Sequence, residues 1–241
     1  MALKSRSTRI PLRISPSTSL STSPSTSLKT SPSTSLRTSL GLLLFALAAI
    51  CLNANPVSAV GSAINLPGFA EFSRNIQNGQ KDVLRGVYAE NVLALPVVQQ
   101  PSGKTVYVSN NDGEVTQFGM ASNFGNIGLL AHNNLAGQFF SQLKPGQEIL
   151  LIYGDGHVES FIVEKVLKFQ ALQPNNPYST FKNLDRDETL TAGEMFNRVY
   201  MGNHHLTFQT CIAADGKSSW GRLFVLAVPR ENAQGAHRRS S

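Results

Sequence analysis

The chain of 241 residues predicts an all-β fold, a barrel or a sandwich, for the part that follows residue 82. Short apolar runs rich in β-branched residues recur along this part, and clusters of Gly, Pro, Asn and Asp separate them. Only two segments show apolar residues at helical spacing. The length that remains after the N-terminal segment fits one domain.

The first half of this part shows strand signals in three places. The run GVYAENVLALPVV at 86–98 is apolar and β-branched. In TVYVSNNDGEVTQF at 105–118, residues 110–113 tolerate positive φ between two alternating runs, which predicts a hairpin. The run IGLLA at 127–131 predicts a short buried strand that leads directly to His132.

A helix and a second hairpin are expected next. Leucine and phenylalanine recur at helical spacing in 135–143, and the Pro-Gly pair at 145–146 ends that pattern. The segment 148–169 carries two apolar runs around a Gly-Asp-Gly turn, which predicts an antiparallel pair.

The C-terminal part combines a long polar loop, a short helix and two strands. The loop is expected at 172–191, and loops of this length in a compact domain are often functional. Thr191 followed three residues later by Glu194 forms a capping-box pattern, which predicts a helix start. HLTFQTCI at 205–212 and RLFVLAV at 222–228 predict two strands joined by a loop.

The positive net charge of the chain is confined to its N-terminal segment. The formal charge is +6, but all 15 acidic residues and 15 of the 21 Lys and Arg residues follow residue 59. The part from residue 60 onward is therefore neutral, and it shows no cluster of Lys and Arg with interleaved aromatic residues. This distribution argues against a nucleic-acid-binding protein.

Residues 1–59 are predicted to be a leader. Three copies of a Ser/Thr/Pro-rich octapeptide fill 15–38, and this composition predicts disorder. A run of thirteen apolar or small residues at 40–52 is shorter than the roughly twenty that span a bilayer. A basic stretch, a short apolar core and small residues before a cut after Ala59 predict a secretory signal peptide.

Other interpretations of the leader stay open. An acid-free, Ser- and Arg-rich segment is also typical of an organelle transit peptide, and an uncleaved segment would act as a signal anchor. A lipoprotein is disfavoured because the bulky Ile50 precedes Cys51, which fits a small residue of the signal core. The rest divides into a linker at 60–82, the β domain at 83–230 and a tail at 231–241.

Cys211 is the only cysteine that remains if the leader is removed. A single cysteine is commonly a small apolar core residue. In an exported protein, however, stable cysteines are normally paired, so an unpaired one indicates a reactive thiol. The thiolate is the nucleophile, and a free cysteine has a pKa of about 8.5, so a nearby cation is needed to favour the anion.

His132 and Arg222 are the candidate partners of this thiol. His132 follows a buried strand directly, whereas the other histidines lie in a turn, in the tail, or about 20 Å away along the cysteine's own strand. If residues 212–221 form a hairpin loop, Arg222 starts the next strand and pairs near Cys211. The structural alternatives are a rim or helix-capping histidine and a surface arginine.

These residues carry a resemblance to a known family. LTFQTC at 206–211, followed by RLFV after a short loop, resembles the sortase signature of a TLxTC strand and a strand that opens with arginine. LLAH and FFSQLKPGQEI resemble the sortase histidine strand and the unit behind it, over about 129–228 in total. Sortases often carry glycine before the histidine, where this chain has Ala131.

The resemblance implies an all-β, sortase-like closed β-barrel of about eight strands with one or two short helices. It implies a cysteine transpeptidase in which Cys211 is the nucleophile, His132 the acid and base, and Arg222 the group that holds a carbonyl oxygen or oxyanion. Ala131 and Thr210 are expected to shape the substrate groove, and the loop at 172–205 to cover it.

The resemblance also implies the partners and the location. The substrate would be the sorting-signal peptide of surface proteins, cut in an LPxTG-like motif, and the acceptor an amine of a cell-wall precursor or a pilin lysine, or water. The protein would act outside the cytoplasm, secreted or anchored at the cell surface, and contact a membrane only through an uncleaved leader. No metal or cofactor is required by this chemistry, and the acidic residues at 185–188 fit a solvated loop.

Two competing functions remain at this point. The first is a secreted β-barrel that binds extended peptides at a strand edge without catalysis. The second is another class of cysteine peptidase, which is disfavoured because the chain contains no papain-like CxxCW motif and no HGC motif.

Overall fold

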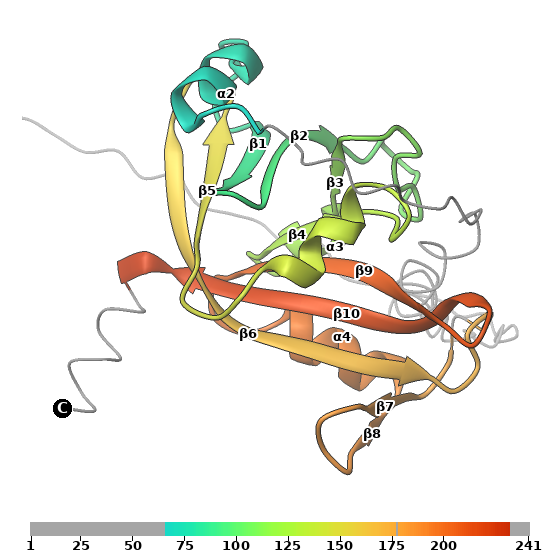
Figure 1. The fold of residues 1–241 in the computed structure, drawn as a ribbon. Coiled ribbons are helices and arrows are strands. Elements are labelled where there is room, and N and C mark those ends of the chain that lie inside the picture. Colours follow the sequence, from blue (N-terminus) through green and yellow to red (C-terminus); the bar gives the residue numbers. More distant parts are fainter. Residues whose placement is uncertain (1–65, 177, 232–241) are drawn as a thin grey trace, which may run out of the picture. The chain divides into compact units, whose positions relative to one another are not determined.

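The computed structural model describes residues 66–176 and 178–231, and Figure 1 shows its elements. The described helices are α2 (Phe69–Ile76), α3 (Gly119–Ser122), the 3-10 helix η1 (Ala136–Gln142) and α4 (Ala192–Tyr200). The described strands are β1 (Leu84–Ala89), β2 (Leu93–Gln99), β3 (Val115–Gln117), β4 (Ile127–Leu130), β5 (Glu148–Tyr153), β6 (Val158–Ala171), β7 (Phe181–Asn183), β8 (Thr189–Leu190), β9 (Leu206–Ala214) and β10 (Lys217–Pro229).

These strands form one sheet that closes on itself. Neighbouring strands follow the order β10-β9-β4-β3-β2-β1-β5-β6-β7-β8, and a further pairing joins β10 to β6. The first eight strands of this order therefore form a closed barrel, while β7 and β8 extend the sheet beyond β6. The expected all-β barrel of about eight strands with a few short helices is confirmed.

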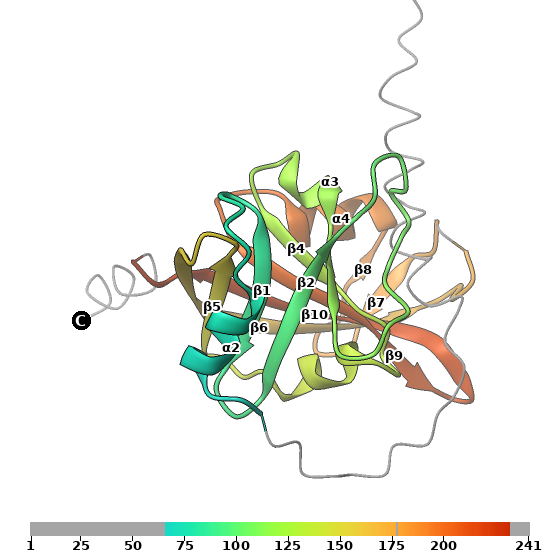
Figure 2. The same cartoon turned by 90° about the horizontal axis from the view of Figure 1, so that it is seen from above.

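Two apolar cores lie on the two faces of the same strands. The barrel interior is filled by side chains that alternate along each strand, such as Phe208 on β9 and Val225 on β10. The outer face of β4, β6, β9 and β10 packs against α4, β7 and β8 through residues such as Phe224 and Phe196. In Figure 1, α4, β7 and β8 lie on one side of β6 and β10, whereas β1, β2 and β5 lie on the other. Figure 2 shows β1 and β2 crossing β9 and β10 at a steep angle.

Three elements predicted from local signals are present. β5 and β6 pair antiparallel around a turn in which Gly156 has a φ of 91°. The capping box of α4 is formed, because the Thr191 hydroxyl accepts from the Glu194 amide at 3.3 Å and the Glu194 carboxylate accepts from the Thr191 amide at 2.8 Å. The helical pattern at 135–143 corresponds to η1.

The hairpin predicted at 105–118 is wrong. β3 pairs parallel with β2, with Val115 opposite Val97, and the residues before β3 form no strand. The Gln100 side chain donates to the carbonyl oxygens of Thr105 and Tyr107 at 3.2 and 2.8 Å, so it supplies hydrogen bonds that a partner strand would otherwise provide. A parallel pair needs a crossover connection, and this segment supplies it.

Two boundaries in the C-terminal part also differ from expectation. The segment at 172–191 contains the β7–β8 hairpin and is not a continuous loop. β10 begins at Lys217 and not at Arg222, because the chain reverses in a tight turn at Asp215 and Gly216, which have φ values of 51° and 69°. Asp and Gly accept this left-handed conformation, so the strands extend closer to the turn than expected.

The region predicted as a linker at 60–82 contains the helix α2. Phe69 and Phe72 of this helix contact Tyr88 of β1, with ring centroids 5.5 and 6.2 Å apart. The predicted leader at 1–59 and most of the tail at 231–241 lie outside the described residues. Among the helices that the structure describes, none has the length and apolar character needed to cross a bilayer.

Candidate active site

Cys211 and Arg222 lie directly opposite each other on adjacent strands. β9 and β10 run antiparallel, and their register places Arg222 against Cys211. Side chains of directly opposite residues point to the same face, with Cβ atoms about 4.5–5.5 Å apart. The predicted pairing of these two residues is therefore confirmed, although Arg222 lies inside its strand and not at its start.

His132 follows the end of β4, the other strand beside β9. β4 runs parallel to β9, with Leu130 opposite Gln209, and the Ala131 amide donates to the Gln209 carbonyl at 3.3 Å. His132 and Cys211 each follow that last strand pair by two residues. Neighbouring strands are about 4.8 Å apart.

These three candidate residues are called the row below: Cys211 on β9, Arg222 opposite it on β10, and His132 two residues after the end of β4. The membership of the two cores shows which face the row occupies. Cys211 belongs to the outer core that α4 covers, and so do Leu130, two residues before His132, and Phe224, two residues after Arg222. The residues that alternate with these along the strands belong to the barrel interior. The outer set is Leu130, Cys211 and Phe224, and the interior set is Ala131, Phe208 and Leu223.

The guanidinium of Arg222 is held in place by backbone oxygens. Its Nη1 donates to the carbonyls of Ser219 and Gly221 at 3.0 and 2.9 Å, and the ring of Phe181 lies 5.8 Å away. The side chain is 1% exposed, and this burial lowers the pKa of Arg222 to about 10. The group is still a cation at neutral pH, and it is fixed in a region of low dielectric where its charge acts strongly.

Cys211 is 4% exposed and His132 is 3% exposed, so both side chains are buried. Nucleophilic chemistry at Cys211 therefore requires that the groups covering it move aside so that a substrate reaches the sulfur.

Ala131 and Thr210 lie together, but on the face of the barrel strands that points to the barrel interior. The Thr210 hydroxyl donates to the Ala131 carbonyl at 2.9 Å, and both residues are buried. Gly137 of η1 fits against this link, since a Cβ at that position would lie 2.8 Å from the Ala131 oxygen and 2.7 Å from the His132 oxygen. The two residues thus join the end of β4 to β9, beside the row but on the opposite face.

Gln209 and Tyr200 are two residues of this region that the sequence analysis did not single out. Gln209 lies two positions before Cys211, so strand alternation places it on the same face. The Tyr200 hydroxyl donates to Oε1 of Gln209 at 2.6 Å, and both side chains are buried. The alternation within LTFQTC would have identified Gln209, whereas Tyr200 could be found only from the packing of α4.

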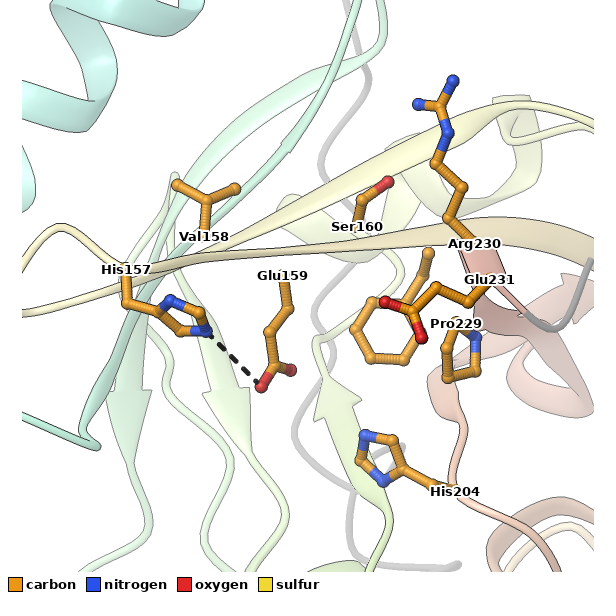
Figure 3. A pocket seen from close by; sticks show the side chains of 9 residues that line it. His157, Val158, Glu159, Ser160, His204, Pro229, Arg230 and Glu231 are labelled. Carbon is orange, nitrogen blue, oxygen red and sulfur yellow. Dashed lines mark ion pairs between the residues drawn. The ribbon is translucent and has the colours of Figure 1, made fainter.

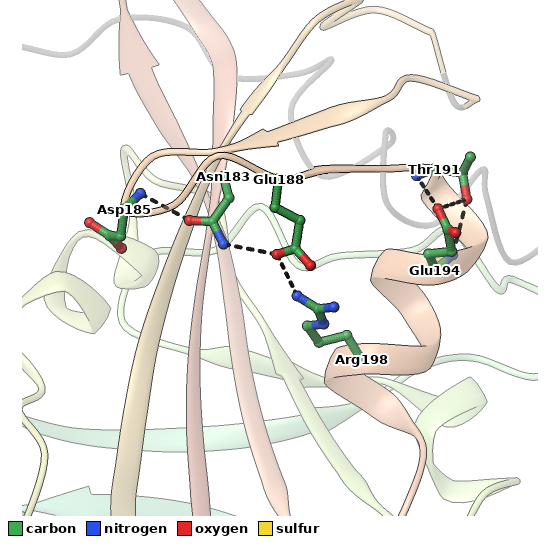
Figure 4. A network of polar contacts seen from close by, with 6 residues as sticks. All are labelled: Asn183, Asp185, Glu188, Thr191, Glu194 and Arg198. Atoms are coloured by element: carbon green, nitrogen blue, oxygen red, sulfur yellow. Dashed lines mark hydrogen bonds and ion pairs between the residues drawn. The ribbon is translucent and has the colours of Figure 1, made fainter.

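A polar network holds together the elements that cover the outer face (Figure 4). The Glu188 carboxylate binds Arg198 of α4 at 2.6 Å and accepts from Asn183 of β7 at 3.2 Å. The Arg198 guanidinium and the Asn183 amide together hold the pKa of Glu188 below its usual range. The β7–β8 hairpin is thereby tied to α4.

The other described histidines have other contacts. Both ring nitrogens of His205 bind backbone oxygens, those of Asn203 at 2.7 Å and Val199 at 2.9 Å. His157 and His204 line a pocket of about 660 Å³ with charged residues of β6 and of the chain after β10 (Figure 3). None of the three residues of the row lines this pocket.

Within the part of the chain that the structure describes, no group of three or more His, Cys, Asp or Glu residues is arranged to hold a metal ion.

No protein-family model matches the sequence, and none of the curated proteins matches it. Among solved structures the chain is similar to a Clostridium perfringens sortase D5 transpeptidase, with 12% identity and a TM-score of 0.40, over 68% of this chain and 89% of that one. It is similar to Listeria monocytogenes sortase A, with 12% identity and a TM-score of 0.40, over 61% and 87%. It is also similar to Streptococcus suis sortase C1, with 14% identity and a TM-score of 0.42, over 78% and 93%. At these identities and TM-scores the assignment of the barrel rests on the strand pairings and not on these similarities.

Proposed function

We propose that this chain is a sortase-like cysteine transpeptidase that cleaves a sorting peptide through a thioester on Cys211. Two things support the proposal: the resemblance of LTFQTC and its following arginine strand to sortase motifs, and the pairing of Cys211 with Arg222. The single observation that carries it is the register that sets Arg222 opposite Cys211, beside the strand β4 that leads to His132.

Cys211 reacts as its thiolate. A cation beside the sulfur favours the thiolate, and the guanidinium of Arg222 is the fixed cation on the adjacent strand.

Acylation follows from the order of groups along the row. The Cys211 thiolate attacks the scissile carbonyl carbon, an S–C bond forms, and the carbonyl electron pair moves to oxygen. The Arg222 guanidinium donates hydrogen bonds to that oxyanion. The tetrahedral species then collapses, the C–N bond breaks, and the imidazolium of His132 gives its proton to the departing amine.

Transfer reverses the roles. An incoming amine gives a proton to the neutral imidazole of His132 and attacks the thioester carbon, after which the S–C bond breaks and the thiolate returns. The acceptor would be an amine of a cell-wall precursor or of a pilin lysine, and water in its place would give hydrolysis. The site of action would be outside the cytoplasm, as the predicted leader at 1–59 implies.

The test is to trap the acyl-enzyme. The full chain, reduced with dithiothreitol, is incubated with a library of LPxTG-like peptides, and the adduct is located by mass spectrometry. We expect a thioester on Cys211, its loss in Cys211→Ala, and its retention in the matched control Cys51→Ala, which removes the other cysteine of the chain. Cleavage of sorting peptides by the Cys211→Ala chain would show that the nucleophile is assigned wrongly.

A peptide-binding barrel without catalysis is the second candidate, and the burial of Cys211 favours it. Thiol labelling separates the two functions. After reduction, a catalytic Cys211 reacts with iodoacetamide at neutral pH faster than a small model thiol does, because more of it is thiolate. A rate no faster than that of the model thiol would favour the binding function.

A further inference from the structure

Gln209 carries a hydrogen-bond donor that nothing in the described part of the chain uses. Its side chain is 1% exposed, and within residues 66–176 and 178–231 its Nε2 has no hydrogen-bond partner. Its other amide atom, Oε1, accepts from the Tyr200 hydroxyl at 2.6 Å. Reversing the amide would leave the oxygen unpartnered instead, so one polar atom of this side chain lacks a partner in either orientation.

The neighbours of Gln209 on the same face explain why the donor is unpartnered. The register places Leu130 beside it on β4 and Phe224 beside it on β10. Neither side chain contains an acceptor. Cys211 follows two residues later, so Gln209 lies in the row of side chains next to the candidate catalytic row.

A buried donor without an acceptor costs free energy, and native cores contain few of them. Leucine or methionine would fill this position without that cost. The amide is therefore best explained by an acceptor that is present only when a ligand is bound. The Tyr200 hydroxyl donates to Oε1 of Gln209. Nε2 leaves the same amide carbon in a different direction, so this unpartnered donor points away from the hydroxyl.

The spacing along β9 indicates what that acceptor is. Gln209 and Cys211 are two residues apart, which is about 6.6–7 Å in a strand. An extended peptide repeats the direction of its carbonyl groups over the same two residues. A peptide whose scissile carbonyl meets Cys211 thus presents a second carbonyl oxygen at the level of Gln209.

We infer that Gln209 positions the substrate by donating a hydrogen bond from Nε2 to the peptide carbonyl oxygen two residues from the scissile bond. The inference rests on the proposed function for the identity of the peptide. It deepens that function by requiring an extended backbone with an amide carbonyl at this position.

Binding of a fluorescein-labelled LPxTG peptide to the reduced full chain tests the inference. Anisotropy is measured for Cys211→Ala, which cannot be acylated, and for Cys211→Ala combined with Gln209→Met. We expect the second substitution to weaken binding about tenfold, because a buried hydrogen bond is lost. The matched control is Gln142→Met in the first chain, which changes an exposed glutamine at the end of η1 and leaves binding unchanged.

A scan with thioamides, which are weak acceptors, locates the contact without any change at position 209. Replacing the peptide carbonyl two residues from the scissile bond weakens binding to Cys211→Ala about tenfold and adds nothing once Gln209→Met is present. Equal effects in both chains, or no binding of any peptide, would overturn the inference.

The same peptides separate this inference from the proposed function. Gln209-dependent binding without a thioester on the Cys211 chain keeps the contact and overturns the transpeptidase. A thioester that forms equally well in Gln209→Met keeps the transpeptidase and overturns the contact.

Discussion

The hydrogen bond between Tyr200 and Gln209 offers a direct measure of how the outer core is built. Tyr200→Phe removes only the hydroxyl, and the Gln209 amide then has no hydrogen-bond partner at either atom within the described part of the chain. Burial raises the pKa of Tyr200 well above its usual value, so the hydroxyl stays protonated and remains a donor across the accessible pH range.

The expected cost follows from the burial of both groups. Tyr200 is 0% exposed and Gln209 is 1% exposed, so the carbonyl oxygen left behind cannot turn to water. Leaving one buried polar group without a partner costs about 1–3 kcal/mol. With a urea m-value of about 2 kcal/mol per molar, a loss of about 2 kcal/mol lowers the unfolding midpoint by about 1 M.

The double variant is the control. Gln209→Leu alone leaves the Tyr200 hydroxyl buried without an acceptor, and it destabilises by a similar amount. Tyr200→Phe with Gln209→Leu replaces both polar groups by apolar ones, and removing both partners together is nearly neutral. We therefore expect the double variant to be more stable than either single variant. If the two losses simply add in urea unfolding, the two groups do not interact and the reasoning fails.

Three further predictions concern the row, the link beside it and its cover. His132→Ala and Arg222→Ala each lower the rate of thioester formation by orders of magnitude while far-UV circular dichroism is retained, and near-wild-type turnover in either variant would refute its role. Gly137→Ala destabilises by about 1–3 kcal/mol in urea unfolding because its Cβ would lie 2.7 Å from a backbone oxygen, whereas Gly193→Ala, with nothing within 4 Å, is neutral or stabilising. Glu188→Gln melts at a lower temperature than wild type at pH 7. The folded-state pKa of Glu188 is lowered, so its stabilisation is present above the unfolded pKa of about 4.3, and the difference in melting temperature vanishes as pH falls through the folded value. A difference that is constant over this pH range would show that the carboxylate charge is not what stabilises the hairpin.

The sequence predicted the elements that depend on neighbouring residues. The turn between β5 and β6, the capping box of α4 and the pairing of β9 with β10 all follow from residues close together in the chain. In each case the chemistry is local: glycine accepts positive φ, a threonine hydroxyl accepts from an amide three residues on, and a tight turn aligns the strands beside it. The register of Arg222 against Cys211 belongs to this class.

The parallel pairs could not be predicted in this way. Alternation of apolar residues is the same for parallel and antiparallel neighbours, so the run before β3 has the sequence pattern of a hairpin although β3 pairs parallel with β2. The position of His132 came from a family resemblance and not from its spacing to Cys211. Whether a residue such as Thr210 faces the groove or the interior depends on which strands flank β9, and the sequence does not specify those neighbours.

The arrangement of the three candidate residues therefore depends on two strand pairings, one antiparallel and one parallel, that respond differently to substitution. Cys211 and Arg222 are joined through a hairpin whose two strands meet at a tight turn, so closing that loop costs little conformational entropy. His132 reaches Cys211 only through the parallel pairing of β4 with β9, and the Thr210–Ala131 link across that pairing spans 79 residues of chain. We expect a change that loosens this link, such as Gly137→Ala, to shift His132 relative to the sulfur while leaving Arg222 opposite it. In a reduced chain with that substitution, a guanidinium still favours the thiolate, but the departing amine has lost its proton donor. Alkylation of Cys211 by iodoacetamide should then be retained while thioester formation is lost, and a parallel loss of both would show that the two sides of the row are not independent.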